Sequence, residues 1–408
     1  MTLTLTQVFL YIAVVTLAIT AIRYFLNKPL SLPVAYVQNF VGAFFIFSGF
    51  VKAIDPLGTS YKINEYFTEF GMQFLEPYTL AFSVITIVLE IVIGVTLLLG
   101  YLRDITVGLL LLLIIFFTFL TGYTTITGHV TDCGCFGDFL KIEPKYSFYK
   151  DIFLSVLILF LVVRRKNIEP LFSNAIAMPV TALATIGFAV FCYRNFAWNE
   201  PIFDFRPYKV GKNIPAQMKA IKPKVVEYVW EYKNKQTSEL KKFSDKEFAQ
   251  VSKEAGFKDT WAYSNREDIV IDPGIPAPIS NFAIFNENGE EITDHILYEE
   301  TGYQFLVIAY DLDKTHPEAF AALNTLSEAS EKAGIPFFAV SAAGPDQRET
   351  FRHEQQTPYP FYEADGTFLK TIVRSNPGLL LIKEGNVIGK WHHKHFPTFE
   401  ELKKDYLK

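Results

Sequence analysis

Six long apolar runs occupy the first 195 residues, and they constrain the fold of this chain more than any other feature. A helix needs about 20 mostly apolar residues to cross the hydrocarbon core of a bilayer. The runs lie at residues 7–26, 33–53, 79–99, 106–126, 148–163 and 175–193. We therefore predict an α-helical membrane bundle of about six spans, which excludes a secreted soluble protein. The first run lacks a basic start and a small-residue cleavage site, so we predict an uncleaved helix there.

The composition changes after Asn195, where the chain becomes charged and rich in aromatic residues, without another apolar run of spanning length. We predict a transmembrane domain over residues 1–195, a connector over 196–271 and an α/β domain over 272–408. In the connector, two strand-like runs predict a hairpin, and Ser244 with Glu247 predicts a capped short helix. The net charge is −5 and no basic patch occurs, so we expect no nucleic-acid partner.

Lysines and arginines in short loops predict how the bundle is oriented in the membrane. The connections on one side carry Arg23, Lys28, Arg103 and the basic cluster 164–166. The connections on the other side carry Lys52, Lys62, Lys141, Lys145 and Lys150. The first set is packed into shorter loops, so we place it in the cytoplasm. Both termini and the C-terminal domain then lie outside.

Two of the three cysteines, Cys133 and Cys135, lie in a short polar loop after the fourth run. Only Gly134 separates them, so their α-carbons can lie within the distance that a disulfide spans. Glycine also lets the backbone bend between them. The predicted orientation places this loop outside, where disulfides persist. We interpret the pair as either a catalytic dithiol or a static disulfide that holds the loop.

Four other residues are candidates for an auxiliary role at this site. Glu90 lies near the middle of the third run, where an ionisable group is costly and usually faces a bundle interior. We weigh three roles for Glu90: it handles protons, it contacts a quinone, or it is a protonated acid bonded to a neighbouring helix. Lys52 ends the second run and is expected to snorkel outward. His129 begins the cysteine loop, after a hydroxyl-rich helix end that suggests a polar pocket. Cys192 lies at the end of the sixth run, on the same side of the membrane as the pair. It is either a third reactive thiol or an inert core residue.

Metal binding is an alternative that we weigh against the thiol chemistry. A four-ligand zinc site would use His129, Cys133, Cys135 and Cys192. The histidines at 392, 393 and 395 lie along one strand end, where alternate side chains face opposite ways. We predict no metal site at either place.

The C-terminal part alternates strands and helices, which favours a layered α/β domain. We predict strands at 305–310 and 336–341, helices at 317–334, 345–356 and 366–374, a hairpin of 378–382 with 387–391, and a last helix at 399–406. This order resembles the thioredoxin fold, and Asn376-Pro377 stands where that family has a cis proline beside its active site. No cysteine follows Cys192, so the Cys-x-x-Cys motif of the family is missing. The resemblance implies a redox-inactive domain that binds client polypeptide near Asn376 and Pro377.

The membrane part resembles the DoxX-like superfamily, in the branch that includes the methylamine-utilisation protein MauE. The resemblance covers about residues 33–163 and is carried by the run Ser48–Gly58, by Glu90 and by the run Asp132–Asp138. It implies a multi-pass protein of the bacterial inner membrane with a periplasmic C-terminal domain. It also implies a role in maturing or maintaining periplasmic or envelope proteins, through their disulfides.

Two functional hypotheses follow. In the first, the protein is a membrane thiol–disulfide oxidoreductase in which Cys133 and Cys135 cycle between dithiol and disulfide, while Glu90 or the hydroxyl-rich pocket serves a quinone or a proton. In the second, it is a structural or assembly component of a membrane complex, with a static disulfide and a thioredoxin-like docking module. A transporter built around Glu90 is a third alternative, disfavoured by the lack of an evident inverted repeat.

Overall fold

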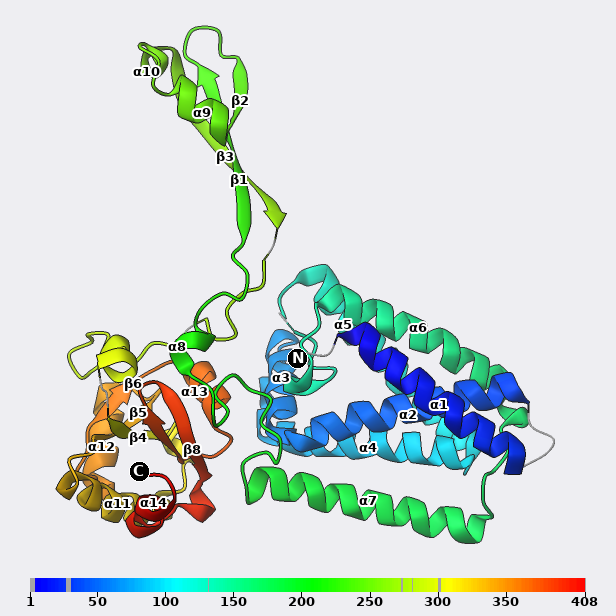
Figure 1. Ribbon diagram of the computed structural model, residues 1–408. Helices are drawn as coiled ribbons and strands as arrows, with labels where there is room; N and C mark the ends of the chain where they lie inside the picture. Colours follow the sequence, from blue (N-terminus) through cyan, green and yellow to red (C-terminus); the bar gives the residue numbers. More distant parts are fainter. Residues whose placement is uncertain are drawn as a thin grey trace.

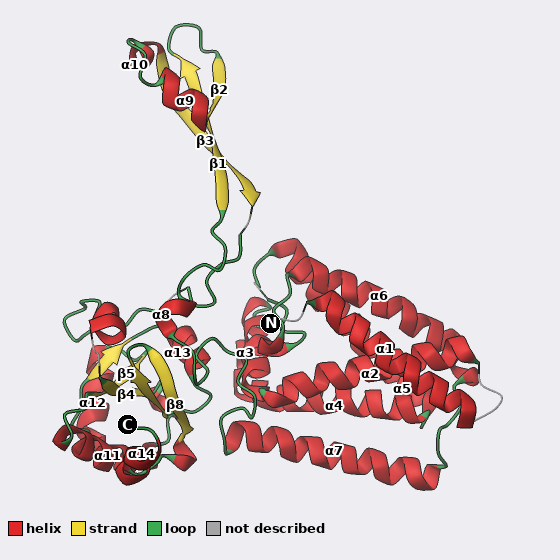
Figure 2. Cartoon of the chain, in the orientation of Figure 1, coloured by secondary structure: helices red, strands yellow, loops and turns green. Residues whose placement is uncertain are grey.

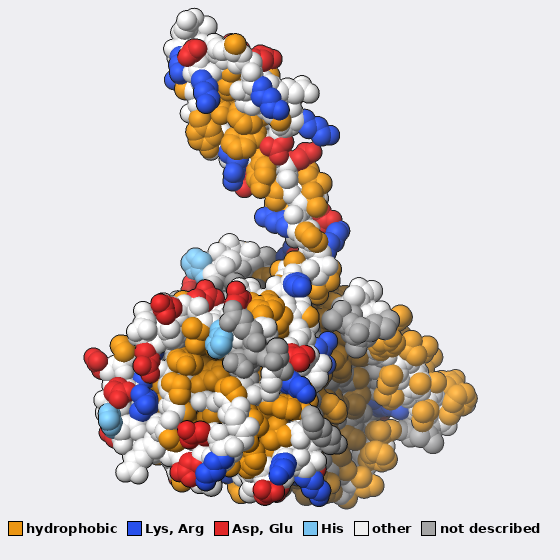
Figure 3. Space-filling view, turned by 60° about the vertical axis from the view of Figure 1, so that its left-hand side comes forward, with side chains coloured by type: hydrophobic (Ala, Val, Ile, Leu, Met, Phe, Trp, Pro, Cys, Tyr) orange, Lys and Arg blue, Asp and Glu red, His pale blue; other side chains and the backbone are white. Residues whose placement is uncertain are grey.

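The computed structural model describes residues 4–26, 31–130, 132–272, 274–280, 282–299 and 302–407. They form three parts, namely a helical bundle, a C-terminal α/β domain beside one end of the bundle, and a narrow arm that projects from between them (Figures 1 and 2). Hydrophobic side chains dominate the visible face of the bundle, whereas charged side chains of both signs are spread over the C-terminal domain and the arm (Figure 3).

Six helices in the described part of the chain are long and apolar enough to cross a membrane, as predicted. They are α1 (Leu5–Leu26), α2 (Leu32–Ile54), α4 (Thr79–Leu99), α5 (Arg103–Thr127), α6 (Pro144–Val163) and α7 (Asn174–Ala197). Helix α6 begins at Pro144, four residues before the apolar run at 148–163. Proline suits a first helical turn, and the polar side chains in the next turns find partners inside the bundle.

Small residues let α2 and α4 pack closely at the centre of the bundle. A β-carbon placed on Gly94 would lie 2.7 Å from the Gly42 carbonyl oxygen, so neither helix tolerates a larger residue here. Helix α7 lies on the outside, along α4 (Figure 1). Between α2 and α4, the short helices α3 (Pro56–Glu69) and η1 (Gln73–Tyr78) cover the bundle end that faces the C-terminal domain.

The C-terminal domain has a five-stranded sheet in the order β6-β5-β4-β7-β8. Strands β4 (Tyr303–Ile308), β5 (Phe337–Ser341) and β6 (Phe361–Glu363) are parallel, and β7 (Gly378–Lys383) and β8 (Asn386–His392) are antiparallel to β4 and to each other. The thioredoxin-like α/β fold is thus confirmed, with a cis Asn376-Pro377 peptide. We did not predict strand β6, because it is only three residues long.

Alternate residues of β4 point into two separate cores. Phe305 and Val307 pack with helices α11 (Phe320–Lys332), α12 (Pro345–Gln355) and α14 (Phe399–Asp405). Leu306 and Ile308 pack on the other face, with α13 (Gly366–Ile372). Helix α11 is shorter than predicted because 317–319 form a 3-10 turn.

The arm is a three-stranded antiparallel sheet in the order β2-β1-β3, built from β1 (Val225–Asn234), β2 (Leu240–Ser244) and β3 (Trp261–Asp272). The predicted hairpin is β1 with β2, and the predicted capping box opens α9 (Asp245–Val251). The third strand was not predicted; α10 (Phe257–Thr260) precedes it. The first residues of the predicted connector pack elsewhere, since Tyr208 and Ile214, which begins α8 (Ile214–Gln217), belong to the core of the C-terminal domain.

Candidate functional site

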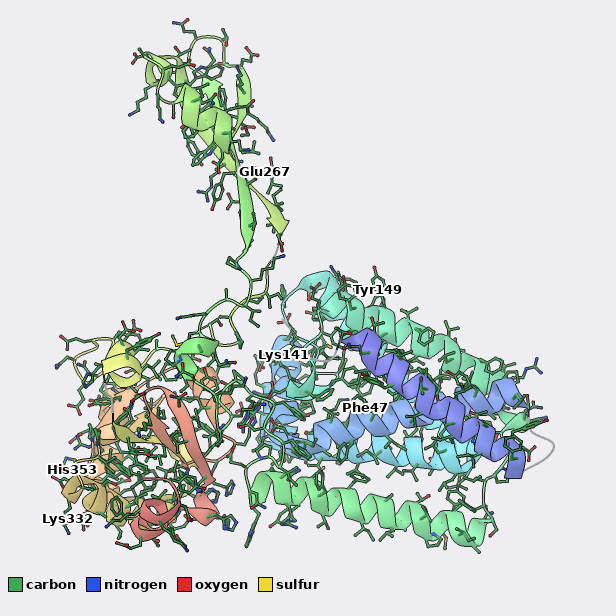
Figure 4. All side chains as sticks on the ribbon, in the orientation of Figure 1. Phe47, Lys141, Tyr149, Glu267, Lys332 and His353 are labelled. Atoms are coloured by element: carbon green, nitrogen blue, oxygen red, sulfur yellow. The ribbon has the colours of Figure 1, made fainter. Side chains whose placement is uncertain are left out.

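The cysteine loop is anchored in the bundle by Phe136. This side chain is fully buried, with its ring 5.8 Å from the rings of both Phe44 and Phe47 on α2. The hydroxyl of Ser48 also donates a hydrogen bond of 3.2 Å to the carbonyl of Cys135. Figure 4 shows Phe47 within the bundle and Lys141, just after the loop, at the end that faces the C-terminal domain. The loop is therefore held from inside the bundle and is not a free surface turn.

The two thiols lie side by side, 3.0 Å apart from Sγ to Sγ. Forming a disulfide requires them to approach by about 1 Å. Ser147, in the first turn of α6, lies 2.9 Å from the Cys133 sulfur. The hydrogen bond from Cys135, together with Ser147 and the charge of Lys150, lowers the pKa of Cys133 to about 7, while the same pairing and burial raise the pKa of Cys135. Cys133 is thus the thiolate-forming member of the pair.

This asymmetry predicts a pH dependence. In the reduced protein, alkylation of Cys133 by a small membrane-permeant maleimide should rise with pH and reach half its maximum near pH 7, because only the thiolate reacts. Ser147→Ala should move this midpoint upward, since it removes one hydrogen bond to the thiolate, whereas Cys192→Ser should not move it. Mass spectrometry of the alkylated peptide gives the rates. A midpoint near the ordinary value of 9.0 would contradict the assignment.

A buried ion pair lies directly behind the thiols. Lys150 Nζ is 2.6 Å from Asp151 Oδ1, and the hydroxyl of Thr121 on α5 donates to the other carboxylate oxygen at 2.9 Å. The ammonium group also lies 5.7 Å from the centre of the Phe136 ring. Sequence reasoning counted Lys150 as a loop charge and missed Asp151. The sequence did carry a signal for this ion pair, because two opposite charges stand side by side at the start of an apolar helix.

A second buried ion pair joins Lys52 on α2 to Glu90 on α4. The two side chains are 5% and 0% exposed, and Lys52 Nζ lies 2.5 Å from Glu90 Oε1. The expectation that Lys52 snorkels outward is wrong, because Glu90 offers it a counter-charge inside the bundle. Glu90 does face the bundle interior, as expected, and its second carboxylate oxygen has no hydrogen-bond partner in the described part of the chain.

A cavity of about 340 Å³ connects the thiols to these charges. Its wall includes Cys133, Cys135, Lys52 and Lys150. The rest of its wall is mostly apolar and aromatic, with side chains from α2, α3, α4 and α5. The predicted pocket beneath the loop therefore exists, although it is far more apolar than the hydroxyl-rich sequence suggested. Threonines of α5 instead bond their own helix backbone, as Thr124 and Thr125 do.

The other two predicted auxiliary residues lie away from the thiols. His129 is exposed and contacts Glu69 at 2.5 Å. Cys192 is buried on α7 against Ala53, Ile87 and Ile91. Within the described ranges, no three His, Cys, Asp or Glu side chains are arranged to hold a metal ion, so the four-ligand zinc hypothesis has no geometric support.

The C-terminal domain docks onto the loop through its proline-containing face. Arg374, three residues before Pro377, contacts Asp55 at the end of α2 at 2.8 Å and Asp138 of the cysteine loop at 3.0 Å. Burial opposes ionisation of Asp55, but the charge of Arg374 and its hydrogen bonds hold the pKa of this carboxyl below its ordinary value. Arg374 is 4% exposed, so a charged group of one domain is buried against the other. We call Arg374, Asp55 and Asp138 the interdomain clamp.

Two further contacts extend this interface. The Tyr61 hydroxyl of α3 lies 3.3 Å from that of Tyr310, and Lys314 contacts Glu76 at 3.2 Å. Asn376 and Pro377, the predicted client-binding residues, are buried; the Asn376 amide donates to the Asp311 carbonyl. Near these two residues, Arg374 and Tyr310 contact the bundle of the same chain.

Comparisons with known proteins concern two regions of the chain. Residues 30–164 match the family described as methylamine utilisation protein MauE. No curated protein matches the chain. A thiol-disulfide oxidoreductase from Bacteroides fragilis NCTC 9343 is similar to a C-terminal region, at 16% identity over 30% of this chain and 96% of that one, with a TM-score of 0.26. A putative protein disulfide isomerase from Bacteroides thetaiotaomicron is similar at 14% identity over 30% and 82%, with a TM-score of 0.24.

Proposed function

We propose that this multi-pass membrane protein is a thiol–disulfide oxidoreductase that oxidises the thiols of proteins outside the bacterial inner membrane. The observation that carries the proposal is the thiol pair itself, 3.0 Å apart, with one low-pKa member and buried ammonium groups lining the same cavity. A purely structural disulfide needs neither an asymmetric pair nor an adjoining cavity.

The proposed exchange proceeds through Cys133. A client thiolate attacks the Cys133 sulfur of the oxidised pair, which forms a mixed disulfide and releases Cys135 as a thiol. A second client thiolate then attacks the mixed disulfide, which releases the client disulfide and leaves Cys133 reduced. Two electrons pass from the client to the cysteine pair. The pair then needs an oxidant before the next turn.

The orientation of the protein is part of this proposal. The bundle buries Arg23, Lys52 and Lys150, so these residues do not count among the loop charges that orient the protein. Arg103 and the cluster 164–166 remain on the side that we place in the cytoplasm. The thiols and the C-terminal domain then face the periplasm, where client disulfides persist.

Trapping tests the exchange. In membranes from cells that express Cys135→Ser, we expect disulfide-linked adducts between Cys133 and outer proteins. The Cys133 thiolate attacks the disulfide of an already oxidised client, which is the reverse of the exchange, and releases one client thiolate. Without Cys135, no neighbouring thiol can then resolve the mixed disulfide. Cys133→Ser should give none, and Cys192→Ser should behave as the wild type, since Cys192 is remote from the pair. Gels without reductant, followed by mass spectrometry, detect the adducts. If the pair stays oxidised whatever the conditions and neither single variant traps a protein, the exchange is disproved.

One observation favours a second candidate function, a structural or assembly component of a membrane complex. The thioredoxin-like domain contacts the bundle through Arg374, near Pro377, which suits a permanent brace. In that case the cysteine variants should lower the amount of folded protein in the membrane without changing the oxidation state of any other protein.

A further inference from the structure

The proposed exchange leaves the cysteine pair reduced, and the cavity beside it indicates what reoxidises it. We propose that this cavity is a binding site for a lipid-soluble quinone, which enters from the bilayer and accepts two electrons from Cys133 and Cys135. This inference rests on the proposed function and names its second substrate.

The shape and composition of the cavity suit an isoprenoid quinone. Its volume of about 340 Å³ lies in the range of small-molecule sites. Aromatic side chains such as Phe67 and Phe117 line it and offer flat surfaces to a quinone ring. Phe82 and Phe116 belong to the same wall, yet they are 42% and 50% exposed on the outer surface of the bundle. The cavity therefore reaches the lipid-facing side between α4 and α5, where an apolar tail can remain in the bilayer.

Two buried lysines supply ammonium groups to the same cavity wall as the thiols. Lys52 and Lys150 each have one ion-pair partner among the described residues, Glu90 and Asp151, and an ammonium group has three donors. Each lysine can thus also donate to a quinone oxygen and stabilise the negative charge that develops there during reduction. An acyl chain of a phospholipid would leave these donors unused.

The chemistry balances without another reagent. The dithiol loses two electrons and two protons and forms the sulfur–sulfur bond of the disulfide. The quinone gains both electrons, and the two protons end on its two oxygens to give the quinol. The quinol leaves through the same opening into the bilayer. Together with the client exchange, one client disulfide forms for each quinone reduced.

The test uses the purified full-length protein in lipid nanodiscs. The pair is reduced, the reductant is removed, and decyl-ubiquinone is added without oxygen. We expect one quinone to be reduced for each pair oxidised, measured by quinone absorbance and by thiol counting. If glutathione disulfide oxidises the pair but decyl-ubiquinone does not, the quinone site is disproved while the exchange stands. If neither reagent oxidises it, the exchange itself fails.

Matched substitutions test where the quinone binds. Thr86 lines the cavity on α4, whereas its neighbour Ile85 is 63% exposed on the outer surface. Thr86→Trp should fill the cavity and slow quinone reduction at least about tenfold, which is about 1.4 kcal/mol, and Ile85→Trp should not. Leu120→Trp with the exposed Leu112→Trp repeats the comparison on α5 if Thr86→Trp fails to fold. Equal rates in each pair of variants would overturn the site.

Photolabelling tests quinone binding without any turnover. In the double variant Cys133→Ser/Cys135→Ser, a photoreactive azido-ubiquinone should label peptides of α4 and α5, and excess decyl-ubiquinone should compete with it. Labelling confined to other helices, or labelling that decyl-ubiquinone does not reduce, would show that the cavity holds only lipid.

Discussion

Lys52→Met should destabilise the bundle by about 3–5 kcal/mol, one of the two largest effects that we expect. Removing one partner of a buried ion pair leaves the other charge without compensation, and the cost falls in this range. Glu90 is fully buried and its second oxygen already lacks a partner among the described residues, so it has no substitute for the ammonium group. Unfolding in mixed micelles by added dodecyl sulfate, followed by circular dichroism, measures the loss.

Two further variants separate the ion pair from a general effect of the substitution. Lys52→Met/Glu90→Leu should regain most of the lost stability, because a well-packed apolar pair often equals or exceeds a buried ion pair. Arg165→Met breaks an exposed pair with Asp104 and should change the free energy of unfolding by less than about 1 kcal/mol. Lys52→Met with wild-type stability, or a double variant no better than the single one, would refute the assignment.

The broad architecture was predictable because it depends on local patterns in the sequence. Long apolar runs have few folded solutions other than membrane helices, and all six appear in the structure. The thioredoxin-like order followed from alternating strands and helices. Strands β3 and β6 were missed, the first because its residues Trp261–Asp272 are largely exposed and carry many charges, and the second because of its shortness.

The site was only half predictable, because its remaining parts depend on contacts between distant segments. The thiol pair and Glu90 carry a signal at their own positions. Nothing in the sequence indicated that Lys52 turns inward to Glu90, since the two are 38 positions apart. Arg374 and Asp138 are 236 positions apart and belong to different domains, so their contact could not be inferred from spacing.

The contact between Arg374 and Asp138 links the thioredoxin-like domain to the cysteine loop, although the domain has no cysteine of its own. The domain touches the loop that carries the thiols through Asp138, three residues after Cys135. Residues near its proline contact the chain's own membrane domain, so we infer that the domain holds the cysteine loop in place.

Arg374→Glu should separate the two domains. It removes the positive charge that Asp55 and Asp138 share and adds a third carboxylate to a buried interface. The loss of about 3–5 kcal/mol expected for a broken buried pair shifts the docked equilibrium by at least about 100-fold. A zero-length carbodiimide coupling reports docking directly, because Lys314 Nζ lies 3.2 Å from Glu76 Oε1 across the interface and both side chains are exposed.

In the wild type, mass spectrometry should detect the Lys314–Glu76 amide, and Arg374→Glu should reduce its yield about tenfold or more. Lys332→Glu makes the same charge change on the remote end of α11 and should leave the yield unchanged (Figure 4). Lys314→Gln should abolish the amide and so identify the coupled residues. We also expect Arg374→Glu to change the alkylation rate of Cys133, because the loop loses its outer support. If the coupled yield and the alkylation rate both match the wild type, the clamp neither docks the domain nor positions the thiols.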